Sequence, residues 1–481
     1  MKTINVSVIS TSGFDPDFDD VKTIEMDDKP FAEGGFGRIY NCQSVNGKPF
    51  KNPQVIKVFK DNHGSAAHSY KTITGLQAGL VKKKEELAEL GIDFMEYYPA
   101  FFGAPQFVFE GELDGDTVQG YSANNLKHFG YVCFTDVIEQ ETLLDKYDST
   151  ISYPNRYAKA YHLMRAFTLL NEIRYIHADF KADNFFVSVN DDGRCALIDF
   201  DSGAIINHLE DETFTVGTPS QDMLAPEIRR ELVETGRAKV NMLTDIWSVA
   251  VASHYLLFIM HPFSMLTEVS DNAIRAYNER YVWPDLDKSF PYYNEANEGL
   301  IEFHKKACGR LPKELIECFR FTFAKGYFNP VYRTSYSQWC MKLKPLLPEG
   351  EARMELSKIR SRKEREEAEQ REKERREDEE RQRLAAMVVK PQDYPDYISK
   401  LVTDLISRKT FMTDHKEELQ KVGQQLEIAD LENKVQRFVT TYFDIWADGK
   451  VSEMEKKKFT FAGKSLKVKP ETIEKLLKRK P

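Results

Sequence analysis

The sequence predicts an α+β fold, in which a β-rich region is followed by a larger helical region, a charged helix and a small all-α domain. Three observations predict this order. Apolar and polar residues alternate through much of the first 60 residues, which is typical of strands. From Arg156 onward apolar residues recur at helical spacing, and the run from about 350 to 386 is almost entirely charged.

The predicted elements follow in chain order. Strands are expected first, over residues 4–10, 21–26, 41–45 and 54–59. They are broken by a glycine-rich turn over 32–40 and by a turn at Asn46-Gly47. A helix is expected over 68–90, and then two strands, 107–113 and 131–138, around a polar insertion. Helical spacing over 157–173 predicts a further helix, and the apolar run 249–260 is short enough to be a buried helix.

Composition divides the chain into four segments: a strand-like extension (1–24), a mixed globular region (25–345), a charged linker (350–388) and a helical C-terminal module (393–481). The linker has no apolar stripe between Ile359 and Leu384, so the a and d positions of a coiled coil are missing. Opposite charges recur at i,i+3 and i,i+4, which favours a solvated, semi-rigid helical spacer. A disordered charged linker is the alternative.

Composition also argues against several classes of partner. The 481-residue chain has a net charge of −9, which argues against nucleic acid as the main partner. No apolar run resembles a signal peptide or reaches membrane-spanning length, so we expect no membrane contact. The six cysteines show no CxxC spacing, which favours reduced thiols and a cytoplasmic location over disulfides or a zinc site.

The most informative motif is HADFKADN at residues 177–184, followed by a predicted strand and the triplet IDF, which contains Asp199. Phosphoryl transfer from a metal nucleotide needs this set of groups. It needs a carboxylate to orient the attacking hydroxyl, a cation near the γ-phosphate and oxygen ligands for magnesium.

A glycine-rich hairpin precedes this motif. Residues 32–39 read AEGGFGRI, and eighteen residues after Ile39 the strand VIKVF contains Lys57. Glycines let backbone N–H groups approach phosphate oxygens, and a lysine in the next strand can contact the α and β phosphates. Taken alone, the hairpin is a common structure and Lys57 would be an ordinary edge-strand lysine.

Together these motifs resemble the protein kinase family, and more narrowly its bacterial eukaryotic-like branch. The resemblance implies a bilobal fold with a β-rich N-lobe and a helical C-lobe, and transfer of the γ-phosphate of ATP to serine or threonine hydroxyls of proteins. It implies ATP with Mg²⁺, or Mn²⁺ in its place. The roles that it implies are a catalytic base at Asp179 and a γ-phosphate contact at Lys181; metal ligands at Asn184 and Asp199; ATP contacts at Ala32, Gly34, Gly35, Gly37, Ile39 and Lys57; and structural positions at Thr218, Glu227, Asp245 and Arg333.

Some positions depart from the family pattern or stay open. Ala178 replaces the arginine beside the catalytic acid, which makes control by activation-segment phosphorylation less expected. The DFG triplet reads Asp199-Phe200-Asp201, so its flexible glycine is lost. The glutamate that pairs with Lys57 is expected at Glu89, with Glu85 and Glu86 as alternatives. A pseudokinase scaffold and a small-molecule kinase remain alternative functions.

The C-terminal module contains DIWADGKVSEME at residues 444–455, in which Asp444, Asp448, Gly449, Val451, Ser452 and Glu455 fall at positions 1, 5, 6, 8, 9 and 12 of a calcium-binding loop. Position 3 is Trp446, which has no oxygen to donate, so we do not expect Ca²⁺. A helix that begins with a Ser452–Glu455 capping box is the preferred interpretation. The pattern also resembles helical domains of the TerB type, and we expect an interaction or regulatory module that binds a protein partner.

Overall fold

A computed structural model of the chain describes residues 1–49, 52–60, 65–207, 213–216, 223–349, 370, 373, 389–408, 415–447 and 449–479. The chain divides into two compact units, Met1–Ser361 and Arg362–Pro481. Each unit has a hydrophobic core of its own. The segment predicted to be a charged linker, 350–388, lies outside the described residues except for 370 and 373.

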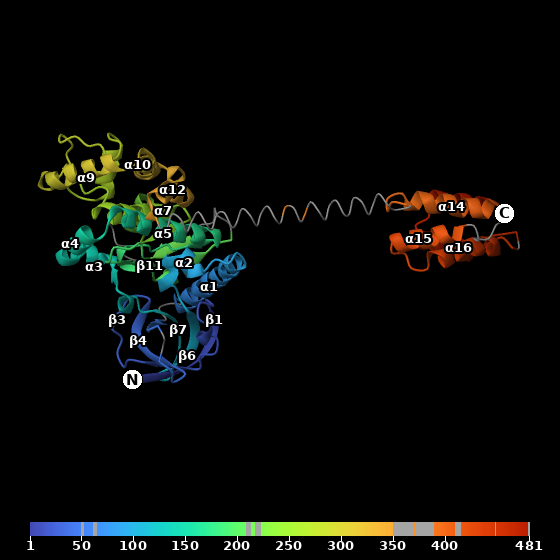
Figure 1. The fold of residues 1–481 in the computed structure, drawn as a ribbon, viewed down its shortest axis with the longest axis horizontal. Coiled ribbons are helices and arrows are strands. Elements are labelled where there is room, and N and C mark those ends of the chain that lie inside the picture. The colour runs from blue at the N-terminus through green and yellow to red at the C-terminus, as the bar shows by residue number, and fades with distance from the viewer. Residues whose placement is uncertain are drawn as a thin grey trace. The chain divides into compact units, whose positions relative to one another are not determined.

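The first unit begins with a seven-stranded antiparallel sheet, whose strands are coloured blue to cyan in Figure 1. The strands are β1 (Lys2–Thr11), β2 (Thr23–Met26), β3 (Ala32–Glu33), β4 (Gly37–Val45), β5 (Gln54–Phe59), β6 (Phe107–Leu113) and β7 (Asp116–Asn124). Their order is β2-β1-β6-β7-β5-β4-β3, and β2 also pairs with β4, which closes the sheet into a barrel-like form. Alternate residues such as Ile4, Ile24, Ile56 and Phe107 are fully buried in one cluster.

Two elements differ from the sequence-based expectation. The polar insertion contains strand β7, which lies between β5 and β6. Its polar residues mask the strand pattern because they are buried and hydrogen-bonded: Ser122 donates to Gln54 at 3.0 Å, and Gln54 donates to Asn124 at 2.6 Å. The expected strand over 131–138 is wrong for most of its length, since β8 ends at Cys133 and a helix follows.

The rest of the first unit is mainly helical. Its helices are α1 (Ser65–Glu89), α2 (Phe94–Tyr97), α3 (Phe134–Glu139), α4 (Glu141–Thr150), α5 (Tyr153–Glu172), α6 (Pro226–Thr235), α7 (Thr244–Phe258), α8 (Asp271–Asn278), α9 (Glu298–Arg310), α10 (Lys313–Arg320), α11 (Gly326–Phe328) and α12 (Tyr336–Leu343). Its short strands are β8 (Tyr131–Cys133), β9 (Tyr175–Ile176), β10 (Phe185–Ser188), β11 (Cys195–Leu197), β12 (Ala204–Ile205), β13 (Thr213–Val216) and β14 (Arg237–Val240). None of the described helices combines the length and apolarity that crossing a membrane requires.

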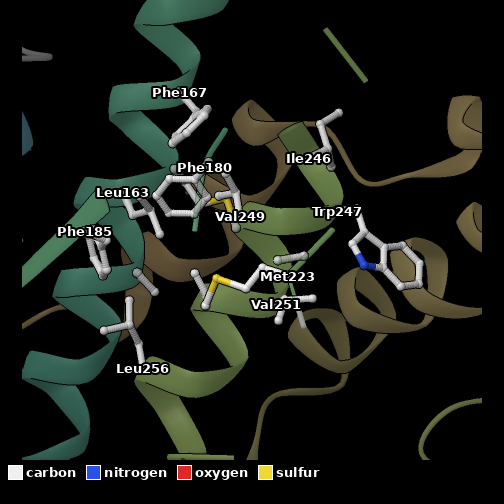
Figure 2. Packing of buried hydrophobic residues seen from close by; sticks show 14 of the residues in the cluster. Leu163, Phe167, Phe180, Phe185, Met223, Ile246, Trp247, Val249, Val251 and Leu256 are labelled. Carbon is white, nitrogen blue, oxygen red and sulfur yellow. The ribbon is translucent and has the colours of Figure 1, made fainter. Parts of the chain in front are cut away.

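Helices α5 and α7 form the centre of the larger core. Both are buried along nearly their whole length, which confirms the buried helix expected around 249–260. Figure 2 shows Leu163 and Phe167 of α5 beside Val249 of α7, with Phe180 between them. Phe180 belongs to the HADFKADN segment and its ring contacts that of Phe167, so the core packs directly against this segment.

The described part of the second unit is helical, with α14 (Tyr394–Arg408), α15 (Lys416–Gln425), α16 (Leu431–Ile445), α17 (Glu453–Ser465) and α18 (Pro470–Lys478). Phe438 of α16 stacks on Phe459 of α17 with ring centroids 4.5 Å apart. Helix α17 begins with a capping box, in which Glu455 accepts from the Ser452 N–H at 2.8 Å and Ser452 caps the Glu455 N–H. The Glu455 carboxylate is thus engaged in the cap, and Asp448 lies outside the described residues.

Candidate active site

The HADFKADN segment forms a loop between β9 and β10 that gathers the two predicted catalytic residues, Asp179 and Lys181, and the predicted metal ligand Asn184. Lys181 Nζ lies 2.8 Å from Asp179 Oδ2, and Asn184 Nδ2 donates to the Asp179 carbonyl at 2.8 Å. Asp179 and Lys181 each remain about one-fifth to one-quarter exposed, whereas Asn184 is buried. The loop therefore presents a carboxylate and a cation toward solvent above a buried amide.

A buried carboxylate from α7 holds the backbone of this loop. Asp245 accepts the His177 N–H at 2.7 Å and the Ala178 N–H at 3.2 Å. Ala178 has a φ of 64°, a left-handed conformation that non-glycine residues adopt rarely, so these bonds stabilise a locally unfavourable turn. Burial raises the pKa of Asp245 to about 7, while the two N–H groups act in the opposite direction.

The segment after β11 joins the loop and supplies Asp199. The Ile198 N–H donates to the Asn184 carbonyl at 3.0 Å, which brings Asp199 beside Asn184. His177 Nε2 lies 3.3 Å from the Ile198 carbonyl, and burial lowers the pKa of His177, so its ring is neutral and donates this bond. Phe200 packs on the His177 ring with centroids 5.5 Å apart. The HADFKADN loop and the Asp199 segment therefore pack together and support each other.

Lys57 of β5 reaches this segment from the sheet. Its ammonium forms an ion pair with Asp199 and another with Asp201, the latter at 2.7 Å. Burial acts to lower the pKa of Lys57, but the two carboxylates outweigh it and hold that pKa well above its usual value. Burial acts to raise the pKa of Asp199, but the Lys57 ammonium lowers it to about 2. Both groups of the Lys57–Asp199 pair are therefore charged at neutral pH.

The expected pairing of Lys57 with Glu89 is corrected by this arrangement, because Lys57 pairs with Asp199 and Asp201 instead. Helix α1 contacts the Asp199 segment near Thr72, whose hydroxyl donates to the Gly203 carbonyl at 3.2 Å. At 1.5 Å of rise per residue, Glu85 lies about 20 Å further along the helix axis and Glu89 about 26 Å. Glu86, the third alternative, forms an ion pair with Lys83 at 3.4 Å.

The glycine-rich segment is a hairpin between β3 and β4. Ala32 is paired with Ile39, and Ile39 is in turn paired with Lys57 on β5. A side chain at Gly37 would meet the Val58 carbonyl at 2.8 Å, so packing against β5 requires that glycine. At Gly34 and Gly35 an added Cβ would meet none of the described residues within 4 Å.

Lys60, which directly follows β5, contacts this hairpin, and the sequence reasoning missed it. Its Nζ donates to the Gly34 carbonyl at 2.9 Å and lies 2.6 Å from Glu33 Oε1, so it holds the turn from β5. Only its position just after the predicted strand with Lys57 could have indicated it. Asp201 was noted in the sequence as a lost glycine, and its contact with Lys57 was missed.

Asn184 and Asp199 suit a magnesium ion by the chemistry of their donor atoms. Because Asn184 Nδ2 faces the Asp179 carbonyl, its Oδ1 points away from that bond, and Asp199 adds a carboxylate. Within the described residues no three His, Cys, Asp or Glu side chains are arranged to hold a metal. Magnesium commonly takes only one or two protein carboxylates and completes its shell with water and substrate phosphates. The pair is compatible with that pattern of binding.

The predicted structural residues Glu227 and Arg333 form an ion pair between the first turn of α6 and the segment after α11. Arg333 Nη1 and Nη2 donate to the two Glu227 oxygens at 2.7 and 2.6 Å, and the Arg333 side chain is fully buried. Such a two-pronged pair fixes the start of α6 relative to the segment after α11. Thr218, the remaining predicted structural residue, lies outside the described residues.

Comparison with known proteins points to one class of domain. Residues 118–321 match the protein kinase domain family, which is less than half of the chain and excludes the hairpin and Lys57. A 150-residue segment is 30% identical to serine/threonine-protein kinase MRCK alpha of Mus musculus, covering 30% of this chain and 8% of that protein. Another, of 141 residues, is 32% identical to serine/threonine-protein kinase Genghis Khan of Drosophila melanogaster, covering 28% and 8%.

The family match therefore supports a protein kinase domain within the first unit. The similar proteins named above are kinases of the serine/threonine class. The chain spans about 8% of the length of these relatives, so the similarity concerns a domain and not their whole architecture.

Proposed function

We propose that the chain is an ATP-dependent serine/threonine protein kinase with a bilobal catalytic domain. The observation that carries the proposal is the convergence of Lys57, Asp179, Lys181, Asn184 and Asp199 on one site from three separate parts of the chain. Surface charges placed at random would not bring together a loop, the segment after a strand and a lysine of the sheet. The kinase domain match and the serine/threonine kinase relatives support the same class.

In the proposed reaction a serine or threonine hydroxyl of a protein attacks the γ-phosphorus of ATP. A bond forms between the hydroxyl oxygen and the γ-phosphorus, the bond from that phosphorus to the β–γ bridging oxygen breaks, and ADP leaves. Asp179 orients the hydroxyl and accepts its proton, and Lys181 offers positive charge beside the transferring group. Lys57 binds the α and β phosphates, and the uncrowded backbone at Gly34 and Gly35 lets these phosphates approach.

Asn184 and Asp199 would hold Mg²⁺, which would neutralise charge that develops on the phosphate oxygens. The protein's own contribution is to keep these two side chains adjacent through the Ile198–Asn184 backbone bond. Mn²⁺ satisfies the same oxygen ligands. Because two side chains alone bind weakly, we expect the metal to enter together with ATP.

The experiment is transfer of labelled phosphate from ATP, measured as autophosphorylation and on a mixture of generic protein substrates. The wild type should incorporate label, and Asp179→Asn should lose about two to four orders of magnitude because the group that accepts the proton is removed. Asp183→Asn is the matched control: its carboxylate lies on the same loop, is exposed, and accepts from Thr135 at 2.7 Å. Equal transfer by the wild type and Asp179→Asn would refute the proposed enzyme.

The same purified proteins also distinguish the proposed protein kinase from two alternative functions. A pseudokinase scaffold would show either no nucleotide-induced rise in melting temperature or a rise without turnover. A small-molecule kinase would label a metabolite or drug and leave protein unlabelled. The Glu227–Arg333 pair favours the protein kinase, since the sequence resemblance associates this pair with that family.

We further propose that the chain belongs to the bacterial branch of such kinases, and that the C-terminal unit is a TerB-like module that binds a protein partner and regulates the domain. The replacement of arginine by Ala178 supports control from outside the activation segment. All six cysteines are free thiols, which supports a reducing, cytoplasmic compartment. Co-purification of a partner with the full chain, lost on deleting residues 393–481, tests the role of the module.

A further inference from the structure

The ammonium of Lys57 lies between two carboxylates that come from the same short turn. Asp199 has a left-handed backbone with a φ of 61°, and a turn of 3₁₀-helix, Phe200–Ser202, follows it directly. This turn brings the side chains of Asp199 and Asp201 to the same side of the segment, where both pair with Lys57. One lysine therefore serves two acids that are two residues apart.

The two acids differ in their access to solvent. The side chain of Asp201 is 0% exposed, whereas that of Asp199 is 23% exposed. Asp199 can thus exchange the lysine for a cation that arrives with the substrate, because its carboxylate is reached from outside. Asp201 has no such access, and its contact with the Lys57 ammonium offsets the cost of burying its carboxylate. Its Oδ1 lies 2.7 Å from Lys57 Nζ and 3.5 Å from the Tyr121 hydroxyl.

Helix α1 supplies no carboxylate to the surroundings of the Lys57 ammonium. The residues with which it contacts this segment carry no carboxylate: Thr72 and His68 bond the Gly203 carbonyl at 3.2 and 3.1 Å, and Gly75 lies against Ile205. The acidic residues of the helix all lie in its last part, from residue 85 onward. Helix α1 therefore binds the backbone of the turn, while the turn itself carries the acid that holds Lys57.

We propose that Asp201 is the positioning residue for Lys57, holding its ammonium toward the nucleotide phosphates in place of an acid on α1. The proposal rests on the proposed phosphotransfer function. It has a consequence for regulation: a displacement of α1 would not separate Lys57 from its acid, since no acid of α1 takes part. Lys57 and Asp199 are instead positioned together by one turn. A movement of this turn would therefore displace both residues from the nucleotide at the same time.

The test measures whether Asp201 acts through Lys57. In the full chain, ATP affinity and kcat/KM for ATP are compared for Asp201→Asn, Lys57→Met and the double variant. Asp201→Asn removes the charge at nearly constant volume, and Asp199 still pairs with Lys57, so the unit should fold. We expect Asp201→Asn to lower kcat/KM for ATP by about 10- to 100-fold, the loss typical of one charged hydrogen bond. In the Lys57→Met background the same change should have no further effect.

Two additional variants complete the test. Asp201→Glu keeps the charge and should recover part of the lost kcat/KM, which a purely steric role would not allow. Asp114→Asn is the matched control: its carboxylate also pairs with a lysine, Lys2, but on the exposed surface, so kcat/KM should not change. The Mg²⁺ concentration for half-maximal rate should be the same in the wild type and Asp201→Asn.

Several results would overturn the proposal. Wild-type kcat/KM in Asp201→Asn, or an equal loss with and without Lys57, would show that the acid does not act through the lysine. A loss that high Mg²⁺ restores would make Asp201 a metal ligand instead. If Asp201→Asn and the double variant both fail to fold, Asp201 belongs to the core and has no positioning role. A wild type that binds ATP but transfers no phosphate would refute the proposed function alone, because the affinity cycle would still report on Lys57 and Asp201.

Discussion

Replacing Arg333 by methionine should destabilise the first unit far more than the same change at an exposed arginine. Arg333 donates to both oxygens of Glu227, at 2.7 and 2.6 Å, and to the carbonyls of Leu243 and Gly326 at 3.0 and 3.1 Å. The guanidinium is fully buried, whereas the Glu227 side chain is 24% exposed. Methionine keeps much of the apolar volume but removes all four donated bonds and leaves a partly buried carboxylate alone.

The size of the effect follows from these contacts. Removing one partner of a buried ion pair costs about 3–5 kcal/mol, and the partial exposure of Glu227 favours the lower end. Unfolding entropy is about 2.1 cal/mol/K per residue, so for a unit of this size 1 kcal/mol corresponds to about 1.3 °C. The melting temperature of Arg333→Met should therefore fall by about 4–7 °C.

The assay is differential scanning calorimetry of the full chain, with the transition of the second unit as an internal reference. Arg275→Met is the control, because Arg275 pairs with Glu279 at 3.2 Å and both side chains are about half exposed. An exposed i,i+4 pair contributes about 0.3–0.5 kcal/mol, so this variant should melt within about 1 °C of the wild type. The double variant Arg333→Met Glu227→Gln should lose less than the sum of its single changes. Equal shifts at Arg333 and Arg275, or strict additivity, would refute the reasoning.

Three further outcomes are expected. Asp245→Asn presents an amide N–H to one of the two backbone N–H groups that Asp245 holds in the HADFKADN loop. Thermal unfolding should therefore show a loss of stability of about 1–3 kcal/mol, and an unchanged melting temperature would contradict this. Burial lowers the pKa of His304 to about 4, below its unfolded value, so the folded state resists protonation and stability is lost as pH falls from about 6.5 toward 4. The unfolding free energy should fall by about 1 kcal/mol between pH 7.5 and 5.5. In His304→Gln it should change less steeply with pH over this range, and a steeper change in that variant would contradict the prediction. Ser452→Ala should cost the second unit about 1 kcal/mol in denaturant unfolding, while Ser465→Ala, at the other end of the same helix, should cost nothing measurable.

Much of the fold was predictable because its signals are local. The strands β1, β2, β4, β5 and β6 and the helices α1, α5 and α7 were predicted from patterns within their own segments, so their existence did not depend on distant partners. Strand β7 escaped detection for a physical reason: its buried Ser122 and Asn124 are polar, and their burial is made favourable by hydrogen bonds to Gln54 of a neighbouring strand and to the Phe102 carbonyl. The closure of the sheet through β2 and β4 was likewise invisible, because pairing between strands is set by tertiary packing.

By itself, the sequence determined which of the candidate site residues share one loop. The spacing within HADFKADN places Asp179, Lys181 and Asn184 on one loop, since residues so close in the chain cannot separate far. Tertiary structure alone decided which acid holds Lys57. The helix that was expected to supply it contacts the site about 20 Å along its axis from its glutamates, and a turn 144 residues away in the chain supplies Asp201 instead. A salt bridge depends on where two charges lie in space, and neither composition nor spacing contains that information.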